Sequence, residues 1–557
     1  MSHWDTHLLI DAIVLCLYFT IIVGIGLWAG RKNRDIREFA LGGRSIPWWA
    51  VLASIVAAET SAATFLGTPA EGFKTQSYIY GQLVIGTILA RVIIAFTFIR
   101  PYYQYRVQSI YEFLTVRFGP KTKNAASGIF LFTRVLGIGV RLYLGGAIMV
   151  VVWRYLFPQI PITIWTYFWG IVFVTVLTTI YTAVGGIKAV VWTDFIQATL
   201  MLGSVGVALF LLFRSIPGGW ATIHEQVGGF GVKKFFQTGL LPDASLGVSI
   251  RHMFEEPYTI FAACIASTLL TMATHGTDQD MVQRMLTAPN YRKSQLSLIL
   301  SGLADIPVAL GFLSVGILLY VFYVVHHDPT VPAADNEIFA HFIVSQMPVG
   351  LRGLIVAGVF ATMMGSTSAA LNALATSFTK DFYLPYINPL ASPARTVRTA
   401  RIATAVFGIL MIGVATVAAS AVLRDSKLTI IPIAIGILGY TYGALLGVFL
   451  LGMLSRSRGA DGTNVFAMIC GTVAVLVLAK IELPGFSWSA LFHGKMIAVS
   501  WNFGWFMPIW WPQFSWPWYV LIGCVVTLGI AIWFPTSLEQ IEAAKAHVNR
   551  NSDSASE

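Results

Sequence analysis

The sequence predicts an all-α polytopic membrane protein, and three observations support this prediction. Among the 557 residues, 56% are hydrophobic and only 11% are charged, whereas about 25% are charged in an ordinary soluble domain. The mean hydropathy is +0.72. Apolar runs of about 20 residues, long enough to cross a bilayer as a helix, recur along the chain. The composition therefore excludes soluble, disordered and collagen-like chains.

The apolar runs predict about 13 membrane spans within a single transmembrane domain over residues 1–535. The first run is an extra N-terminal helix and not a cleaved signal peptide, because no Lys or Arg precedes it and Arg31, Lys32 and Arg34 follow it. The runs lie at 8–30, 46–70, 78–100, 125–156, 163–183, 188–213, 257–283, 294–325, 352–379, 400–423, 429–453, 461–480 and 517–535.

The formal net charge of +10 has an explanation in a membrane protein. Cationic residues crowd alternate loops, and such loops face the cytoplasm under the positive-inside rule. We therefore expect a multi-pass protein of the plasma (inner) membrane with an outside N-terminus, a cytoplasmic C-terminus and no nucleic-acid partner. The cationic loops contain Arg31, Lys32, Arg34, Arg37 and Arg44; Arg100, Arg106, Arg117, Lys121 and Lys123; Arg284, Arg292 and Lys293; Lys380, Arg395, Arg398 and Arg401; and Arg456 and Arg458.

Two regions near the C-terminus are not read as spans. The segment 484–518 is rich in Trp, a residue that prefers the membrane–water interface, so it predicts an interfacial or re-entrant segment. Residues 536–557 predict a polar cytoplasmic tail that begins as a short amphipathic helix.

Two spans carry clusters of small and polar residues that predict helices broken at mid-depth. These clusters are AAETSAATFLG at 57–67 and TMATHGTDQD at 271–280. Unwound backbone inside a membrane is tolerated only around a buried site or a cavity. The two spans lie five spans apart, which is the spacing of an inverted five-plus-five repeat whose first helices are broken.

Charged residues inside the spans mark places where function is expected. Each costs about 2.5 kcal/mol or more at the bilayer centre, so each should be paired or line a cavity. Glu59 is read either as a solute or ion ligand or as the partner of an Arg. Arg134 and Arg141 are seven residues apart, so one of them could hold a carboxylate while the alternative is pairing with Glu59, Asp278 or Asp305.

Four motifs of the chain resemble those of the sodium/solute symporters. The most specific is GGIKAVVWTDFIQ at 185–197, which is similar to the family signature GG-x-x-AV-x-x-TD-x-x-Q. The others are YEFL with RFG at 111–119, TDQ with VQR at 277–284, and LNA before KDFY at 371–383. All four occur in the order that the family has.

The resemblance implies a leucine-transporter-type fold. One extra N-terminal helix would precede an inverted five-plus-five repeat, with core repeats at about 46–213 and 257–453, and accessory helices would follow. It also implies a secondary active transporter that couples Na⁺ to the uptake of a small polar organic solute, such as a sugar or a carboxylate, by alternating access. Solute and lipid bilayer are the expected partners, and a monomer or weak oligomer is expected.

The family's conserved Na⁺ site can be placed on this sequence through the motifs. The resemblance implies carbonyl ligands from Ala57, Thr60 and Thr362, and hydroxyl ligands at positions 365 and 366. Ser366 fits this pattern, whereas Gly365 departs from it and removes one ligand. Asp194 matches an aspartate that, in some members, contributes to a second Na⁺ site or to the sodium exit path.

The resemblance also places the solute site at mid-membrane among the core helices. The solute-binding residues implied by position are Glu59, Ser61, Thr64, Gln82, Asp278 and Gln279. Arg141 is added as a candidate ligand for a carboxylate.

Three other functions are weighed against this one. A transporter of the same fold could use H⁺, with Glu59 or Asp194 as the titrating group, or could work without Na⁺, and Gly365 keeps this alternative open. A solute sensor would carry a long soluble signalling domain, whereas only residues 536–557 follow the last span. A membrane-embedded enzyme would need a catalytic cluster such as paired His at mid-depth, and the sequence offers none. We therefore expect a protein that is not an enzyme.

Overall fold

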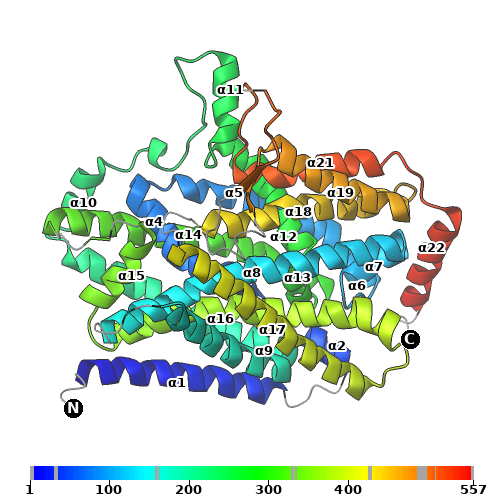
Figure 1. Ribbon diagram of the computed structural model, residues 1–557, viewed down its shortest axis with the longest axis horizontal. Helices are drawn as coiled ribbons and strands as arrows, with labels where there is room; N and C mark the ends of the chain where they lie inside the picture. The colour runs from blue at the N-terminus through cyan, green and yellow to red at the C-terminus, as the bar shows by residue number, and fades with distance from the viewer. Residues whose placement is uncertain are drawn as a thin grey trace.

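The computed structural model of the chain consists largely of helices that run in a common direction (Figure 1). It describes residues 6–30, 35–156, 161, 163–327, 331–332, 335–424, 430–485, 499–508 and 510–553. Helix α1 (Thr6–Ala29) starts at the left end in Figure 1, where α10 (Trp220–Val227) also lies. Helix α22 (Leu538–Asp553) lies at the opposite end. These two ends are called the α10 end and the α22 end below.

The remaining helices follow the predicted order of apolar runs. In the first half they are α2 (Ile36–Leu41), α3 (Trp48–Glu59), α4 (Ala62–Thr75), α5 (Leu83–Ile94), α6 (Arg100–Gln104), α7 (Tyr111–Arg117), α8 (Pro120–Leu156) and α9 (Ile164–Ser215). In the second half they are α11 (Leu246–Glu255), α12 (Thr268–Gly276), α13 (Gln279–Met285), α14 (Tyr291–His326), α15 (Asp335–Gln346), α16 (Leu351–Ser377), α17 (Pro393–Arg424), α18 (Ile430–Leu454), α19 (Asp461–Leu478) and α21 (Tyr519–Ala531).

The apolar runs fold as helices because a helix satisfies its own backbone hydrogen bonds where lipid offers none. Nine of the described helices are long and apolar enough to cross a bilayer, or ten if the bent pair Ile36–Arg44 and Trp48–Glu59 counts as one span. Each predicted run coincides with a helix, with part of one, or with a pair of shorter helices. The all-helical membrane architecture is therefore confirmed, and the exact number of crossings stays a prediction.

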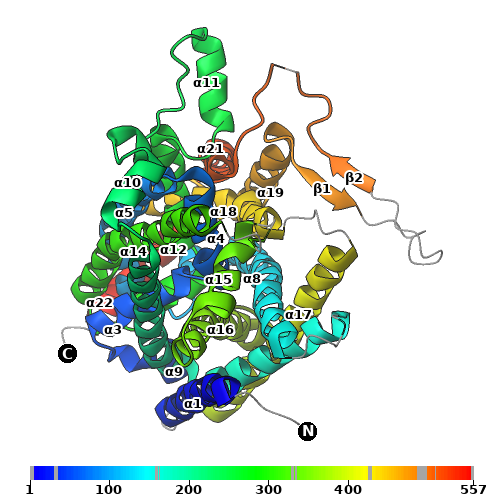
Figure 2. The ribbon, with the colours of Figure 1, turned by 90° about the vertical axis from the view of Figure 1, so that its left-hand side faces the viewer.

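Helix α16 forms the centre of the bundle. Its apolar window is 94% buried, and it packs against α9, α1, α8, α17, α13 and α3. Figure 2, which looks along the helices, shows α16 with α1, α9, α8 and α17 near it. Protein neighbours on all sides explain why nearly every side chain of α16 is buried.

Both predicted helix breaks are present. Helix α3 ends at Glu59 and α4 starts at Ala62, because Thr60 and Ser61 have extended backbone angles, ψ 94° and 169°. The Ser61 hydroxyl accepts a hydrogen bond from the Thr64 N–H at 3.4 Å, which caps α4.

The second break separates α12 from α13 at Thr277 and Asp278. The Asp278 side chain accepts a hydrogen bond from the Asp280 N–H at 2.9 Å and caps α13. A third irregularity lies at Gly186, where α9 bends with φ 57°, a conformation that favours glycine. This bend divides α9 into the two runs that the sequence predicts as separate spans.

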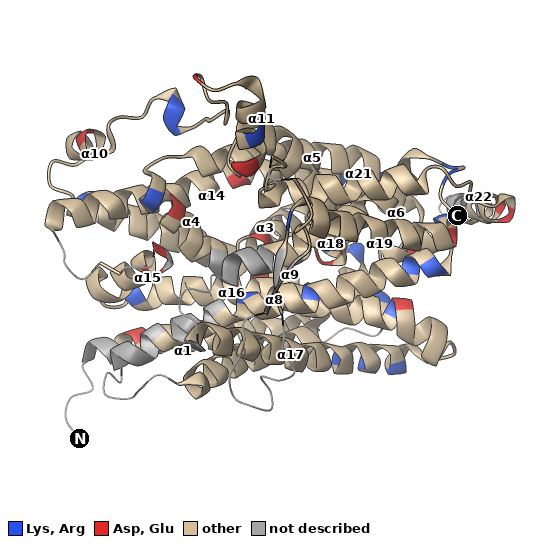
Figure 3. Ribbon diagram, turned by 45° about the horizontal axis from the view of Figure 1, so that its top comes forward, with Lys and Arg blue, Asp and Glu red and all other residues tan. Residues whose placement is uncertain are grey.

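The C-terminal region contains a short β ribbon and a terminal helix, and its predicted interfacial and cytoplasmic positions stay predictions. Strands β1 (Glu482–Gly485) and β2 (Val499–Asn502) form an antiparallel ribbon within the Trp-rich segment. The positions 486–498 and 509 of that segment lie outside the described residues. The predicted tail helix is α22, which extends to Asp553. Figure 3 shows Lys and Arg gathered toward the α22 end.

Candidate functional site

A cavity of about 230 Å³ lies beside the break between α3 and α4. Side chains from the end of α3, from α4, from the start of α5, from the end of α12 and from the middle of α14 form its wall. Its volume is below the 300–1,000 Å³ that is typical of pockets for drug-sized ligands, so it suits a small solute. The lining residues are Glu59, Thr60, Thr64, Thr68, Tyr80, Leu83, Val84, Thr87, Arg91, His275, Asp305, Val308, Ala309 and Phe312.

Four lining residues form an ion-paired group, called the cavity cluster below: Glu59, Arg91, His275 and Asp305. The Arg91 guanidinium pairs with Glu59 and, at 2.9 Å, with Asp305. His275 Nε2 contacts the same Glu59 carboxylate. The two carboxylates remain 17% and 18% exposed, whereas Arg91 is 1% exposed. The side chains of Glu59 and Asp305 therefore border the cavity with part of their surface.

The predicted solute residues divide between this cavity and other places. Glu59 and Thr64 line the cavity, and Ser61 caps α4 beside it with 5% of its surface exposed. Gln82 is not among the residues that line the cavity. Its Nε2 donates to the Tyr258 carbonyl at 2.8 Å and so connects the start of α5 to the segment before α12.

The other three predicted solute residues also lie outside the cavity lining. Asp278 and Gln279 cap and start α13, where Gln279 Oε1 accepts from the Ile110 N–H at 2.8 Å. Arg141 lies half-buried on α8, and no hydrogen bond or ion pair joins it to another residue in the part of the chain that the structure describes.

Sequence reasoning missed three members of the cavity wall that carry its chemistry. The sequence does not predict Arg91 or His275 as site residues, and it predicts Asp305 only as an alternative ion-pair partner of Arg134 or Arg141. Their position inside apolar runs was the available signal, because intramembrane charges line cavities or pair with one another.

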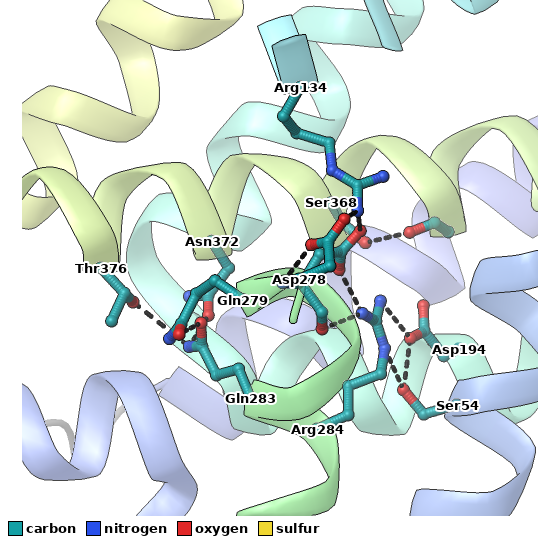
Figure 4. A network of polar contacts seen from close by, with 12 residues as sticks. Ser54, Arg134, Asp194, Asp278, Gln279, Gln283, Arg284, Ser368, Asn372 and Thr376 are labelled. Atoms are coloured by element: carbon teal, nitrogen blue, oxygen red, sulfur yellow. Dashed lines mark hydrogen bonds and ion pairs between the residues drawn. The ribbon is translucent and has the colours of Figure 1, made fainter. Parts of the chain in front are cut away.

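A second polar group, called the sealed network below, lies where α13 meets α3, α8, α9 and α18 (Figure 4). Its members are Ser54, Arg134, Asp194, Asp278, Asp280, Arg284 and Tyr442. Each of them is at most 5% exposed.

Two guanidiniums hold three carboxylates in the sealed network. Arg284 pairs with Asp280 and, at 3.3 Å, with Asp194. Arg134 pairs with Asp278 and, at 3.6 Å, with Asp280. The ion-paired members thus contain three carboxylates and two guanidiniums. Buried carboxylates are stable only when cations compensate them.

Hydroxyl groups donate hydrogen bonds to one oxygen of Asp194 and to one oxygen of Asp278. The Ser54 hydroxyl donates to Asp194 Oδ2 at 2.6 Å, and the Tyr442 hydroxyl donates to Asp278 Oδ2 at 2.5 Å. Asp194 Oδ1 is buried and has no hydrogen-bond partner among the described residues. Buried oxygens without partners are rare in proteins, and a bound ion or water can satisfy them.

The free oxygen of Asp194 faces Gly365 on α16. A Cβ atom at position 365 would lie 3.4 Å from Asp194 Oδ1, 3.0 Å from Gln197 Oε1 and 3.8 Å from the Ala57 carbonyl oxygen. The three oxygens and Gly365 are called the Gly365 cradle below. Oxygens from α3 and α9 therefore converge at the position where the family's hydroxyl is missing.

Two other predicted Na⁺-site residues use their hydroxyl hydrogens within their own helix. Thr362 and Ser366 donate their hydroxyl hydrogens to carbonyls of α16, at 2.8 Å from Val359 and 3.1 Å from Met363. Their oxygens keep lone pairs for a cation. Thr60 lies in the break itself and lines the cavity. The donor set is all oxygen with one free carboxylate atom, which fits a hard monovalent cation such as Na⁺.

No cluster of three His, Cys, Asp or Glu side chains with metal-binding geometry occurs within the described ranges.

An apolar helical bundle whose helices break beside a polar cavity has the architecture of a secondary transporter. The sequence matches the sodium:solute symporter family over residues 39–471, and the chain belongs to this family. Its members couple solute transport to Na⁺ and are not enzymes, and the chain is accordingly a membrane-embedded, multi-pass transporter.

Relatives of known function transport different solutes. The chain is 27% identical to the sodium/sialic acid symporter SiaT of Proteus mirabilis, over 84% of the chain and 89% of the relative. It is 27% identical to the sodium-dependent multivitamin transporter of Oryctolagus cuniculus (85% and 70%). It is 26% identical to the sodium/glucose cotransporter of Vibrio parahaemolyticus (71% and 73%).

Among solved structures, the chain resembles a Na⁺-coupled sialic acid symporter in a substrate-bound outward-open state. The TM-score is 0.73 at 23% identity, covering 94% of this chain and 97% of the other. The fold predicted from the sequence is thereby confirmed at the level of a symporter fold.

Proposed function

We propose that this protein takes up a small polar organic solute together with Na⁺ by alternating access. The cavity beside the α3–α4 break is the solute site, and the Gly365 cradle with Thr60, Thr362 and Ser366 is the Na⁺ site. The helices form the inverted five-plus-five repeat with about 13 spans that the sequence predicts.

One observation carries this proposal: the two sites share the end of α3. The Ala57 carbonyl points to the Gly365 cradle, while Glu59 and Thr60, only two and three residues further on, line the cavity. A cation that holds the end of α3 also positions these two residues for the solute. Such a shared element makes the binding of cation and solute mutually favourable, and this reciprocity is the basis of coupling.

The cavity favours a solute rich in hydroxyl groups or with an amide or carboxylate, such as a sugar or a sugar acid. Hydroxyl groups of Thr64, Thr68, Tyr80 and Thr87 line it, and they can both donate and accept hydrogen bonds. Arg141 is proposed to meet a carboxylate of the solute during the transport cycle, because its guanidinium is uncommitted among the described residues.

The membrane orientation follows the charge pattern. The N-terminus is outside and the α22 end faces the cytoplasm of the plasma (inner) membrane, because Lys and Arg gather at that end (Figure 3). The protein works as a monomer or a weak oligomer.

Coupling to H⁺ is the second candidate function, and one contact favours it. His275 Nε2 contacts the Glu59 carboxylate inside the cavity, so a proton could move between an imidazole and a carboxylate that touch the solute. Na⁺ remains the first choice because the cradle offers oxygens without a partner.

The proposal is tested by a thermal-unfolding screen of the purified protein. Sugars, carboxylates, amino acids and vitamins are added one at a time in Na⁺ or in choline. A transported solute is expected to raise Tm in Na⁺ and to raise it much less in choline, because ligands stabilise the state they bind. Equal shifts in both salts would contradict Na⁺ coupling.

The matched variant in this screen is Glu59→Gln. We expect it to weaken the solute-induced shift by about tenfold in solute concentration, because it removes a charge-assisted hydrogen bond. The shift that Na⁺ alone produces should remain. A variant with the solute response of the wild type would return Glu59 to a purely structural role.

A further inference from the structure

The Gly365 cradle contains Gln197 of α9, a side chain of the motif at 185–197 that the Na⁺-site prediction does not include. We propose that the Gln197 carboxamide oxygen, together with Asp194 Oδ1, is a cation ligand that replaces the hydroxyl missing at Gly365. This inference rests on the proposed function, because it specifies how the proposed Na⁺ site is completed.

The first argument is burial without a partner. Gln197 is 1% exposed and Asp194 is 0% exposed. Gln197 Oε1 and Asp194 Oδ1 each lack a hydrogen-bond partner among the described residues. A buried acceptor left unsatisfied costs about 1–3 kcal/mol. Two such oxygens that face the same point are explained by a cation that binds both.

The second argument is the orientation of the Gln197 amide. Its Nε2 donates to the Tyr18 hydroxyl at 3.4 Å, and that hydroxyl is directed at the Met364 sulfur at 3.7 Å. Since the amide nitrogen is engaged with Tyr18, the amide oxygen is the atom that faces Gly365. Tyr18 thereby acts as a positioning residue for the ligand oxygen.

The third argument is space. A Cβ at position 365 would lie 3.0 Å from Gln197 Oε1, which is closer than an ordinary contact of carbon with oxygen. Gly365 therefore leaves room for the amide oxygen, and a Ser at this position would need part of the same space. In this chain the Gln197 oxygen occupies space into which a Ser side chain at position 365 would extend.

The fourth argument is charge. The ion-paired members of the sealed network contain three carboxylates and two guanidiniums, and Asp194 presents its free oxygen at the edge of this network. A monovalent cation in the cradle would offset the negative charge of the Asp194 carboxylate, because a buried charge is stable only when it is compensated. An oxygen-only donor set selects an alkali cation over metals that prefer nitrogen or sulfur.

The test is a Na⁺ titration of Tm in a choline background, with purified protein and no solute. The wild type is expected to show a saturable rise in Tm. Gln197→Ala should raise the half-maximal Na⁺ concentration about tenfold, the effect of losing one ligand to a charge. Gln197→Glu keeps an oxygen at this place and should bind Na⁺ at least as tightly as the wild type.

The double variant Gln197→Ala/Gly365→Ser is expected to recover most of the lost Na⁺ affinity, because the new hydroxyl replaces the lost oxygen. Gln295→Ala is the matched control. This Gln is half-buried on α14 and donates to the Ala95 carbonyl at 2.7 Å, so its loss should leave the half-maximal Na⁺ concentration unchanged.

Two results would overturn the inference, and they are distinguishable. If Gln197→Ala lowers Tm equally at all Na⁺ concentrations while the half-maximal concentration stays at the wild-type value, Gln197 is structural and Na⁺ coupling itself survives. If the wild type shows no Na⁺-dependent rise, the proposed Na⁺ site and its Gln197 ligand both fail.

Discussion

The cavity cluster and the sealed network are built from the same chemistry and differ in their access to solvent. In both, arginines are shared between carboxylates beside a broken helix. In the cavity cluster the carboxylates of Glu59 and Asp305 are 17% and 18% exposed. In the sealed network Asp194 and Asp280 are 0% and 4% exposed at their side chains.

This difference in exposure suggests different roles for the two groups. The cavity cluster is suited to binding a solute, and the sealed network is suited to keeping the helices closed around α13. A charge that touches water can exchange water for a solute, so the cavity cluster is suited to recognition. A charge that is fully buried can separate from its partner only at a large cost, so the sealed network holds α13 against its neighbours. In the proposed alternating-access cycle this closure opens at another stage, and the proposed cation site at its edge is suited to control the opening.

The largest expected effect comes from removing the central cation of the sealed network. Arg284→Met leaves Asp194 without a guanidinium and leaves Asp280 with Arg134 alone, at 3.6 Å. Breaking a buried pair in this way costs about 3–5 kcal/mol. We expect a strong fall in Tm, or loss of folded protein, in detergent solution. The control is Arg251→Ala, which breaks an exposed pair with Glu255 and should cost at most about 1 kcal/mol.

The same change in the cavity cluster sharpens the comparison. Arg91→Met also removes a shared guanidinium, but the freed carboxylates of Glu59 and Asp305 contact the cavity. Water can solvate them there, so the loss of stability should be smaller, about 2 kcal/mol. Solute-induced stabilisation should disappear. If thermal unfolding shows Arg91→Met to be as destabilising as Arg284→Met, the distinction between the two groups is wrong.

A smaller effect is expected from Tyr442→Phe, which removes the hydroxyl that donates to Asp278 at 2.5 Å. Asp278 keeps Arg134, so stability should fall by about 1.5 kcal/mol, the value of one hydrogen bond to a charged group. The matched control is Tyr440→Phe on the same helix, which is half-buried and should change stability by less than about 0.5 kcal/mol. Equal Tm values for the two variants would contradict the hydrogen bond.

The smallest expected effect on stability comes from Ser366→Ala. The Ser366 hydroxyl donates within its own helix, so its loss should change Tm in choline by less than about 0.5 kcal/mol in free energy. Its oxygen is a proposed Na⁺ ligand, so the Na⁺ concentration needed for uptake should rise many-fold. Unchanged Na⁺ dependence in proteoliposomes would remove Ser366 from the site.

The fold and the helix breaks could be predicted from the sequence because they depend on local properties. Apolar length determines a span, and the clusters at 57–67 and 271–280 interrupt helices wherever small and polar residues replace apolar ones. The family motif at 185–197 then supplied the symporter fold.

The partners of the buried charges could not be predicted, because they depend on tertiary packing. Arg91 lies 32 residues from Glu59 in the chain, and nothing in the spacing along one helix indicates that they meet. Gln82 is predicted at the solute site, yet the segment between α11 and α12 packs so that the Tyr258 carbonyl lies beside it.

The surroundings of Gly365 also depend on tertiary packing and could not be predicted from the sequence. In the sequence it is a missing ligand, and this absence raised the alternative of H⁺ coupling. In the structure the space that it leaves is faced by Gln197 Oε1 and Asp194 Oδ1. Gln197 is in the quoted motif at 185–197, but its direction depends on the Tyr18 hydroxyl of a different helix.

The central claim, that solute uptake is driven by Na⁺, is tested most directly in proteoliposomes. The radiolabelled form of a solute found in the thermal screen is offered with an inward Na⁺ gradient at equal pH on both sides, and separately with an inward pH gradient in choline. The account predicts accumulation above the external concentration in the first condition and only equilibration in the second. Accumulation driven by the pH gradient alone, or none with the Na⁺ gradient, would contradict it.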